Sequence, residues 1–258
     1  MGRQGDIVLP RGAERALAEE VPVALVYNGV TQAVMMATPA DLEDFAHGFT
    51  LTEGLARPGA IEEVEVVAHG PGLELRMWLD PASAAGLAAR RRALAGPVGC
   101  GLCGIESLEQ AVPAPAAVGT DALRIAPGRL SRLLPQMQAR QPLHDATGAA
   151  HAAGLWRPGE GFVAVREDVG RHNALDKPAG ALARRGETGA GAAVVLTSRV
   201  SVEMVQKAAA LGAEAICAVS APTALAVRVA EEAGLTLIAN LKAGPPRALT
   251  HPHRLSGA

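Results

Sequence analysis

Short apolar runs separated by turn residues fill the first part of the chain, and this alternation is typical of β-hairpins. The apolar runs 21–26 and 32–36 flank Asn28-Gly29, a pair that favours a two-residue hairpin turn. The runs 61–67 and 73–79 predict a second hairpin in the same way. We therefore expect a small antiparallel sheet in this part of the chain.

Helices are expected after each hairpin. A Thr-Pro pair followed by acidic residues predicts a helix over 38–53, with Thr38 as the N-cap and Gly54 as the stop. A second helix, rich in arginine, is predicted over 81–94. Residues 111–118 are rich in proline and alanine and predict a linker between two parts of the chain.

After the linker, short apolar strands alternate with helical segments. This alternation predicts a mostly parallel sheet covered by helices. We therefore expect an α/β domain over 119–258 and a smaller hairpin-rich subdomain over 1–118, α+β overall. The predicted strands are 162–165, 192–196, 215–219 and 235–239, and the predicted helices are 127–140, 173–185 with an interruption at Pro178, 200–211 and 223–233.

Composition narrows the class of protein without identifying it. With 49% hydrophobic and 19% charged residues among 258, the chain is expected to fold rather than remain disordered. A net charge of −2 predicts no general attraction to nucleic acid or to a membrane surface. The first ten residues lack the apolar run of a signal peptide. A cytoplasmic protein is therefore expected.

Polar segments follow three of the four predicted strands, where ligands gather on parallel sheets. Each segment contains a cationic side chain and groups that form hydrogen bonds. The pattern favours a site for an anionic ligand rich in heteroatoms, such as a nucleotide or a pterin. Taken singly, the same residues could instead cap helices or lie in solvent. The three segments are 166–173, 197–201 and 240–244.

Two of the three cysteines, Cys100 and Cys103, are separated by two residues and bracketed by glycines. Two thiols at this spacing can share a metal, form a redox disulfide or relay sulfur. Cys217 lies in an apolar run and is expected to be buried, which leaves too few ligands for a closed zinc site. The glycines disfavour a thioredoxin-type helix, so an open loop that carries sulfur as a persulfide fits best.

Three motifs together resemble the formate dehydrogenase accessory sulfurtransferase family, FdhD. They occupy 100–104, 167–177 and 197–207, with weaker support at 38–54 and 147–153. The resemblance implies a cytoplasmic sulfurtransferase that takes persulfide sulfur from a cysteine desulfurase. It also implies transfer of that sulfur to the molybdenum cofactor of formate dehydrogenase. The cofactor, bis(molybdopterin guanine dinucleotide), would be a bound substrate, and no permanent metal is expected.

The resemblance extends to individual residues and to the fold. It implies that Cys100 carries the persulfide and that Cys103 assists. It also implies a homodimer and a three-layer C-terminal domain similar to cytidine deaminases. At Asn240 and Leu249 the family usually carries aromatic residues, so base stacking is not expected there. The residues implied to bind the cofactor are His151, Asp168, Arg171, His172, Asn173, Ser198, Arg199, Ser201, Met204, Lys207, Asn240, Leu241, Lys242, Ala243, Gly244 and Pro245.

Two hypotheses from other classes stay open at this point. The first is a cofactor-binding chaperone whose cysteines are dispensable. The second is a zinc-dependent nucleotide hydrolase or deaminase. A zinc deaminase would carry His-x-Glu upstream of Pro-Cys-x-x-Cys, and neither pattern occurs around Cys100. Met204, Lys207 and His151 also have a purely structural interpretation, in helix packing or in a satisfied core.

Overall fold

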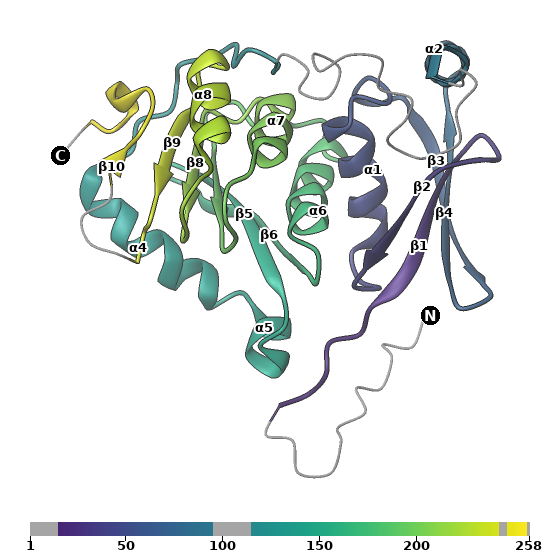
Figure 1. The fold of residues 1–258 in the computed structure, drawn as a ribbon, viewed down its shortest axis with the longest axis horizontal. Helices are drawn as coiled ribbons and strands as arrows, with labels where there is room; N and C mark the ends of the chain where they lie inside the picture. The colour runs from purple at the N-terminus through teal and green to yellow at the C-terminus, as the bar shows by residue number, and fades with distance from the viewer. Residues whose placement is uncertain (1–14, 95–114, 243–246, 257–258) are drawn as a thin grey trace.

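A four-stranded sheet forms one end of the molecule in the computed structural model, which describes residues 15–94, 115–242 and 247–256 (Figure 1). Its strand order is β2-β1-β4-β3. Both predicted hairpins are confirmed as antiparallel pairs, and the central strands β1 and β4 run parallel. The strands are β1 (Val21–Tyr27), β2 (Val30–Ala37), β3 (Ile61–His69) and β4 (Gly72–Leu79).

One face of this sheet forms a hydrophobic core with helix α1 (Leu42–Thr52). Alternate residues of the central strands point to it, among them Leu25 and Tyr27 of β1 and Leu75 of β4, all fully buried. Phe45 of α1 packs against them. Because strand side chains alternate between faces, the opposite face carries polar residues such as Glu74 and Arg76 together with the exposed apolar side chains of Val34, Met36 and Trp78.

The second sheet has six strands in the order β10-β9-β8-β7-β5-β6. β7, β8 and β9 are parallel to one another, whereas β5 is antiparallel to both of its neighbours. The expectation of an α/β fold is confirmed, but the prediction of a mostly parallel sheet is wrong, because three of the five strand pairs described are antiparallel. The strands are β5 (His151–Arg157), β6 (Gly161–Asp168), β7 (Ala193–Leu196), β8 (Ala215–Ala218), β9 (Thr236–Ala239) and β10 (Arg247–Ala248).

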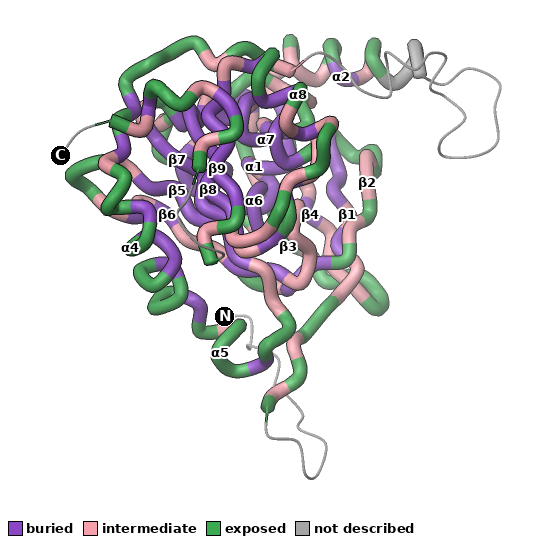
Figure 2. The backbone as a smooth tube through the Cα atoms, turned by 60° about the vertical axis from the view of Figure 1, so that its left-hand side comes forward, coloured by how far each residue is buried: buried purple, intermediate pink, exposed green. Residues whose placement is uncertain are grey.

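Helices cover both faces of the second sheet. Helices α6, α7 and α8 pack on one face and α4 lies on the other, so this part has three layers (Figures 1 and 2). The similarity to cytidine deaminases stays a prediction. The helices are α2 (Pro81–Leu94), α4 (Pro127–Gln138), α5 (Pro142–Thr147), α6 (Arg171–Ala183), α7 (Val202–Leu211) and α8 (Ala224–Glu232), with a short 3-10 helix at Pro252–Arg254.

Strand β5 was not predicted, although it lies between β6 and β7 within the sheet. Its sequence, His-Ala-Ala-Gly-Leu-Trp-Arg, contains two alanines and a glycine, which have low strand propensity. Gly154 is needed there because a Cβ atom would meet the Phe162 ring at 2.6 Å. Packing against neighbouring strands therefore decides the structure of β5, and that information is not local.

The predicted N-cap of the first helix is wrong. Helix α1 begins at Leu42, after Asp41 in a left-handed conformation with φ 52°. The N–H and hydroxyl oxygen of Thr38 instead bond across the molecule, to the Asp168 carboxylate at 3.0 Å and the Val169 N–H at 3.1 Å. A distant partner thus replaces the local cap.

The predicted interruption at Pro178 is also absent, because α6 runs through this proline. A proline inside a helix removes one backbone hydrogen bond and is costly. Every residue of α6 from Asn173 to Leu182 is buried. Packing on both sides of the helix therefore outweighs the lost hydrogen bond.

Helices α1 and α6 cross with their backbones in direct contact. A Cβ atom at Gly48 of α1 would collide with the carbonyl oxygen of Asp176. One at Gly180 of α6 would collide with the carbonyl oxygen of Asp44. The first helix of the proposed N-terminal subdomain is therefore packed tightly on the second part of the chain.

We expect Gly180→Ala to lower the free energy of unfolding by about 3 kcal/mol, because a backbone atom of the opposing helix occupies the space of the new methyl group. Chemical denaturation monitored by circular dichroism measures this change. The control is Gly86→Ala on the exposed face of α2, where a Cβ meets nothing within 4 Å. That variant should gain about 0.5–1 kcal/mol from the better helix propensity of alanine. Equal effects of the two substitutions would contradict the close crossing.

Candidate functional site

One edge of the six-stranded sheet gathers most of the predicted site residues. Because β5 is antiparallel to both β6 and β7, the latter two run in the same direction, and their carboxyl ends share an edge. β5 begins at that edge with His151. Thr197, just after β7, bonds Ala152 of β5 through both its N–H and its hydroxyl, at 3.1 and 2.9 Å. The segments after β6 and β7 therefore lie together, beside His151.

Asp168, at the end of β6, is fully buried and forms an ion pair of 2.6 Å with the fully buried Lys177. One carboxylate oxygen accepts from Lys177 and from the Thr38 N–H. The other accepts from the Gly170 N–H at 2.8 Å and from the Asn173 amide at 3.1 Å. These four donors occupy the acceptor positions of the carboxylate. Asp168 and Asn173 therefore hold the loop after β6 in place rather than face a ligand.

His172 lies in the first turn of α6 with its ring half-buried. Its Nε2 atom is buried and has no hydrogen-bond partner among the residues that the structure describes. Burial, followed by the positive charge of Arg171, lowers the pKa of His172. The same two causes lower the pKa of His151. Near neutral pH both imidazoles are uncharged beside the Arg171 guanidinium, an arrangement that suits an anionic ligand with polar ring atoms.

Lys207 of α7 is buried in a cluster of oxygens. Its ammonium group donates to Asp176 at 2.9 Å, to Glu53 at 2.6 Å and to the Thr52 hydroxyl at 3.0 Å. Burial alone would lower the pKa of Lys207, but Asp176 and Glu53 outweigh it and raise the pKa, so the side chain stays charged. The Phe49 ring lies 5.5 Å away. The positive charge of Lys207, which was expected to bind a phosphate, is therefore neutralised by carboxylates of the protein itself. The same contacts of Lys207 hold α1, α6 and α7 together.

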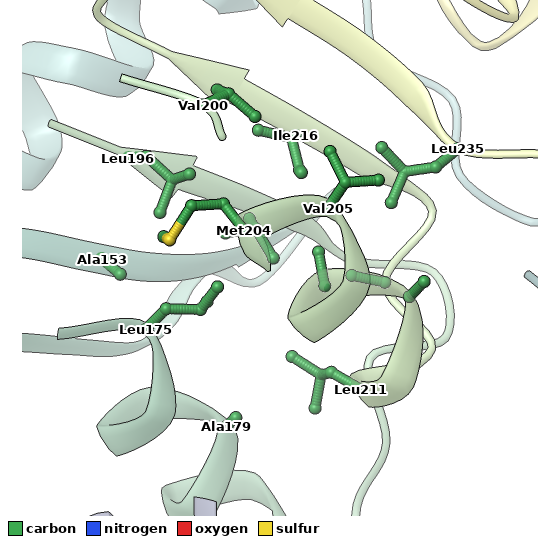
Figure 3. Close-up of a cluster of buried hydrophobic side chains, with 14 of the residues drawn as sticks. Ala153, Leu175, Ala179, Leu196, Val200, Met204, Val205, Leu211, Ile216 and Leu235 are labelled. Atoms are coloured by element: carbon green, nitrogen blue, oxygen red, sulfur yellow. The ribbon is translucent and has the colours of Figure 1, made fainter. Parts of the chain in front are cut away.

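Met204 belongs to the hydrophobic core (Figure 3). It is fully buried and packs with Leu175 of α6 and Leu196 of β7, which agrees with the structural interpretation of this residue. Ser201 is the N-cap residue of α7, although its hydroxyl forms no capping hydrogen bond. In the segment between the end of β7 and Ser201, Ser198 is buried and Arg199 is exposed. Arg199 is therefore the cation of this segment that solvent can reach.

The third predicted segment lies further along the same edge of the sheet, because β9 is parallel to β8 and β7. Three strands separate β6 from β9, which puts their ends about 19 Å apart at the usual spacing of neighbouring strands. Asn240 and Lys242 are exposed, and Leu241 packs on the core under α4, on the other face of the sheet. Ala243, Gly244 and Pro245 lie outside the described residues.

Cys100 and Cys103 also lie outside the described residues. The helix that precedes them, α2, is anchored near the site, because Arg90 donates to the carbonyl oxygens of Glu53 and Gly54 at 3.4 and 3.1 Å. The end of α1 therefore contacts both α2 and the Lys207 cluster. Cys217 of β8 is fully buried, as expected, and burial raises the pKa of its thiol to about 12.

Comparison with known proteins places these motifs in a family. The profile of the FdhD/NarQ family matches residues 18–256. The chain belongs to this family. It is 51% identical over 255 residues to the sulfur carrier protein FdhD of Cupriavidus necator, covering 98% of this chain and 87% of that protein. It is 51% identical over 231 residues to the sulfur carrier protein FdhD of Agrobacterium fabrum, covering 89% and 85%.

A solved structure shares the whole fold. It is a protein from Desulfotalea psychrophila described as a formate dehydrogenase accessory protein. The two structures align with a TM-score of 0.70 at 25% sequence identity, over 94% of this chain and 91% of that one. The fold of this chain is therefore that of an FdhD-family protein.

Sequence reasoning missed the acidic partners of the site. Glu53 and Asp176 bind Lys207, and Glu203 is a charged neighbour of His172. A signal was present, because Lys207 lies at helical spacing between Met204 and Leu211 on the apolar side of α7. A lysine at such a position requires a buried carboxylate.

In residues 15–94, 115–242 and 247–256, no group of three or more His, Cys, Asp or Glu side chains is placed to hold a metal ion. Among the same residues, no helix is long and apolar enough to cross a membrane.

We expect the folded protein to lose stability as the pH falls from 7 to 5. Because burial lowers the pKa of His172 in the folded state, the unfolded chain takes up a proton near pH 6.5 before the folded one does. The charged groups around His172 are Arg171, Lys207, Glu203 and Glu53. His172→Gln should reduce the loss, and denaturation at several pH values measures it. An equal slope in wild type and His172→Gln would contradict this assignment.

Proposed function

We propose that this chain is a sulfur carrier that takes persulfide sulfur from a cysteine desulfurase and delivers it to the molybdenum cofactor for formate dehydrogenase. The observation that carries the proposal is the match to sulfur carrier proteins over almost the whole chain. The cofactor, in its bis(molybdopterin guanine dinucleotide) form, is the bound substrate. The proposal includes a homodimer that acts in the cytoplasm.

In the first step, the Cys100 thiolate attacks the outer sulfur of a persulfide on the desulfurase. The sulfur–sulfur bond of the donor breaks and a new one forms at Cys100, while the donor cysteine leaves as a thiolate. The step exchanges one sulfur–sulfur bond for another, so it needs no oxidant or reductant. It leaves Cys100 as a persulfide.

In the second step, the sulfur must gain two electrons to become a sulfide ligand. The Cys103 thiolate can supply them by attacking the inner sulfur of the Cys100 persulfide. The outer sulfur then leaves as hydrosulfide, and a disulfide between Cys100 and Cys103 remains. An external thiol reduces this disulfide before the next cycle. The spacing of two residues between the cysteines suits this second attack.

The edge of the sheet at β5, β6 and β7 supports a place for the acceptor. Arg171 and His172 lie at the N-terminus of α6, where the helix dipole favours negative charge. The unpartnered Nε2 atom of His172 and the half-buried His151 offer hydrogen-bonding groups to a pterin or a guanine. Arg199, in the segment after β7 on the same edge of the sheet, adds an exposed cation. A cofactor that carries a diphosphate beside heteroaromatic rings could use both the cations and the hydrogen-bonding groups.

We expect Cys100→Ala to abolish sulfur loading. After incubation with a cysteine desulfurase and cysteine, mass spectrometry should find one added sulfur atom on the wild-type peptide that contains Cys100. The matched control is Cys217→Ala, which should load normally because that thiol is fully buried and its pKa of about 12 keeps it protonated.

The same variants separate the alternatives. If Cys100→Ala restores full formate dehydrogenase activity to a deletion strain, the chain is a cofactor-binding chaperone with dispensable cysteines. If the purified protein contains stoichiometric zinc and hydrolyses nucleotides, the sulfur-carrier proposal is wrong. A reduced, folded sample that takes up no sulfur counts against the first step.

A further inference from the structure

A hollow of about 280 Å³ lies at the start of α4, on the face of the sheet opposite α6, α7 and α8. It is remote from the candidate site, because Trp156, which lines it, is five residues along β5 from His151, or about 17 Å at the usual rise per residue. The lining residues are Arg124, Ala126, Arg129, Arg132, Leu133, Gln136, Trp156, Pro158, Gly159 and Gly161.

Three arginines line this hollow, and no carboxylate does. Arg124 pairs with Asp121 at 3.0 Å, outside the lining. Arg129 and Arg132 are exposed and form no ion pair or hydrogen bond through their side chains within the described parts of the chain. Guanidinium groups bind phosphate oxygens in a bidentate manner. Two of the three cations are thus free for a ligand.

The position of the arginines is unfavourable for the helix itself. The first turn of α4 contains no acidic residue, and its N-cap, Ala126, has no side chain that could cap the helix. Arg129 and Arg132 add positive charge near the end of the helix that already carries the positive pole of the dipole. Such a local conflict is expected where a sequence serves a ligand rather than stability. A bound anion would relieve it.

The floor of the hollow is apolar. Leu133 and Trp156 are buried in the core below it, and Ala126 and Pro158 complete it. Gly159 and Gly161 of the β5–β6 turn line its wall without side chains. The recess is close in size to small-molecule sites and much smaller than a protein docking surface. Its shape suits a compact ligand with one charged and one apolar part.

We propose that this hollow binds a small organic phosphate that carries at least two negative charges beside a planar or apolar group. Arg129 and Arg132 hold the phosphate oxygens, and the apolar part rests on the floor above Trp156. The inference does not depend on the sulfur-carrier proposal, because it uses other residues on another face.

Trp156 gives a direct test. The chain has two tryptophans, and Trp78→Phe, on the first sheet, leaves Trp156 as the only one. In this background at low salt, inorganic pyrophosphate and ADP are titrated separately while tryptophan fluorescence is recorded. We expect saturable changes with both probes, and tighter binding of ADP because its base covers the apolar floor. A response to pyrophosphate that equals or exceeds that to ADP would overturn the organic part of the assignment.

Three variants in the same background test the arginines. Arg129→Ala and Arg132→Ala should each weaken binding about tenfold, the usual effect of losing one charged hydrogen-bond donor. Arg228→Ala, an exposed arginine on α8, should bind as the parent does. Circular dichroism should show all three folded, because the side chains of these exposed arginines form no ion pair or hydrogen bond within the described residues. His172→Ala should also leave the Trp156 signal unchanged.

An absent fluorescence response, or one that Arg129→Ala and Arg132→Ala leave intact, would overturn the proposal. A response to a glutamate-rich decapeptide but to neither phosphate probe would also overturn it and would identify a protein-docking surface instead.

Discussion

The direct backbone contact between α1 and α6 at Gly48 and Gly180 is the constraint on which the rest of the structure depends. It brings the end of α1 next to α6 and α7, so that Thr52 and Glu53 reach Lys207. Larger residues at either glycine would push the helices apart and would leave a buried lysine with fewer partners, which is costly. One close approach thus joins the hairpin sheet to the α/β part and completes the buried charge cluster.

Much of the fold could be predicted from the sequence because its signals are local. The Asn28-Gly29 turn and the alternating runs around it identify both strands of the first hairpin. The boundaries of α2 also match, since a proline begins it. Strand β5, the role of Thr38 and the continuity of α6 through Pro178 were missed, because partners far along the chain decide each of them.

The candidate site, too, was predicted only where its signals are local in the sequence. Motif resemblance identified the segments after β6 and β7, and the sheet brings them together with His151. It did not distinguish residues that face a ligand from residues that support them, because that depends on burial. Asp168 and Lys207 have their polar atoms satisfied within the protein, whereas His172 retains an unpartnered nitrogen.

The bonds of Thr38 have a consequence for how sequences of this fold can diverge. Thr38 joins the end of the first hairpin to Asp168 and Val169, which are 130 and 131 residues further along the chain. Neither segment can change its backbone conformation alone. The Asp168 carboxylate has no acceptor position left, and the hydroxyl oxygen of Thr38 already accepts from the Val169 N–H. Two regions that look independent in sequence are therefore expected to evolve as a pair, and an exchange of the hairpin between relatives would have to carry the β6–α6 loop with it.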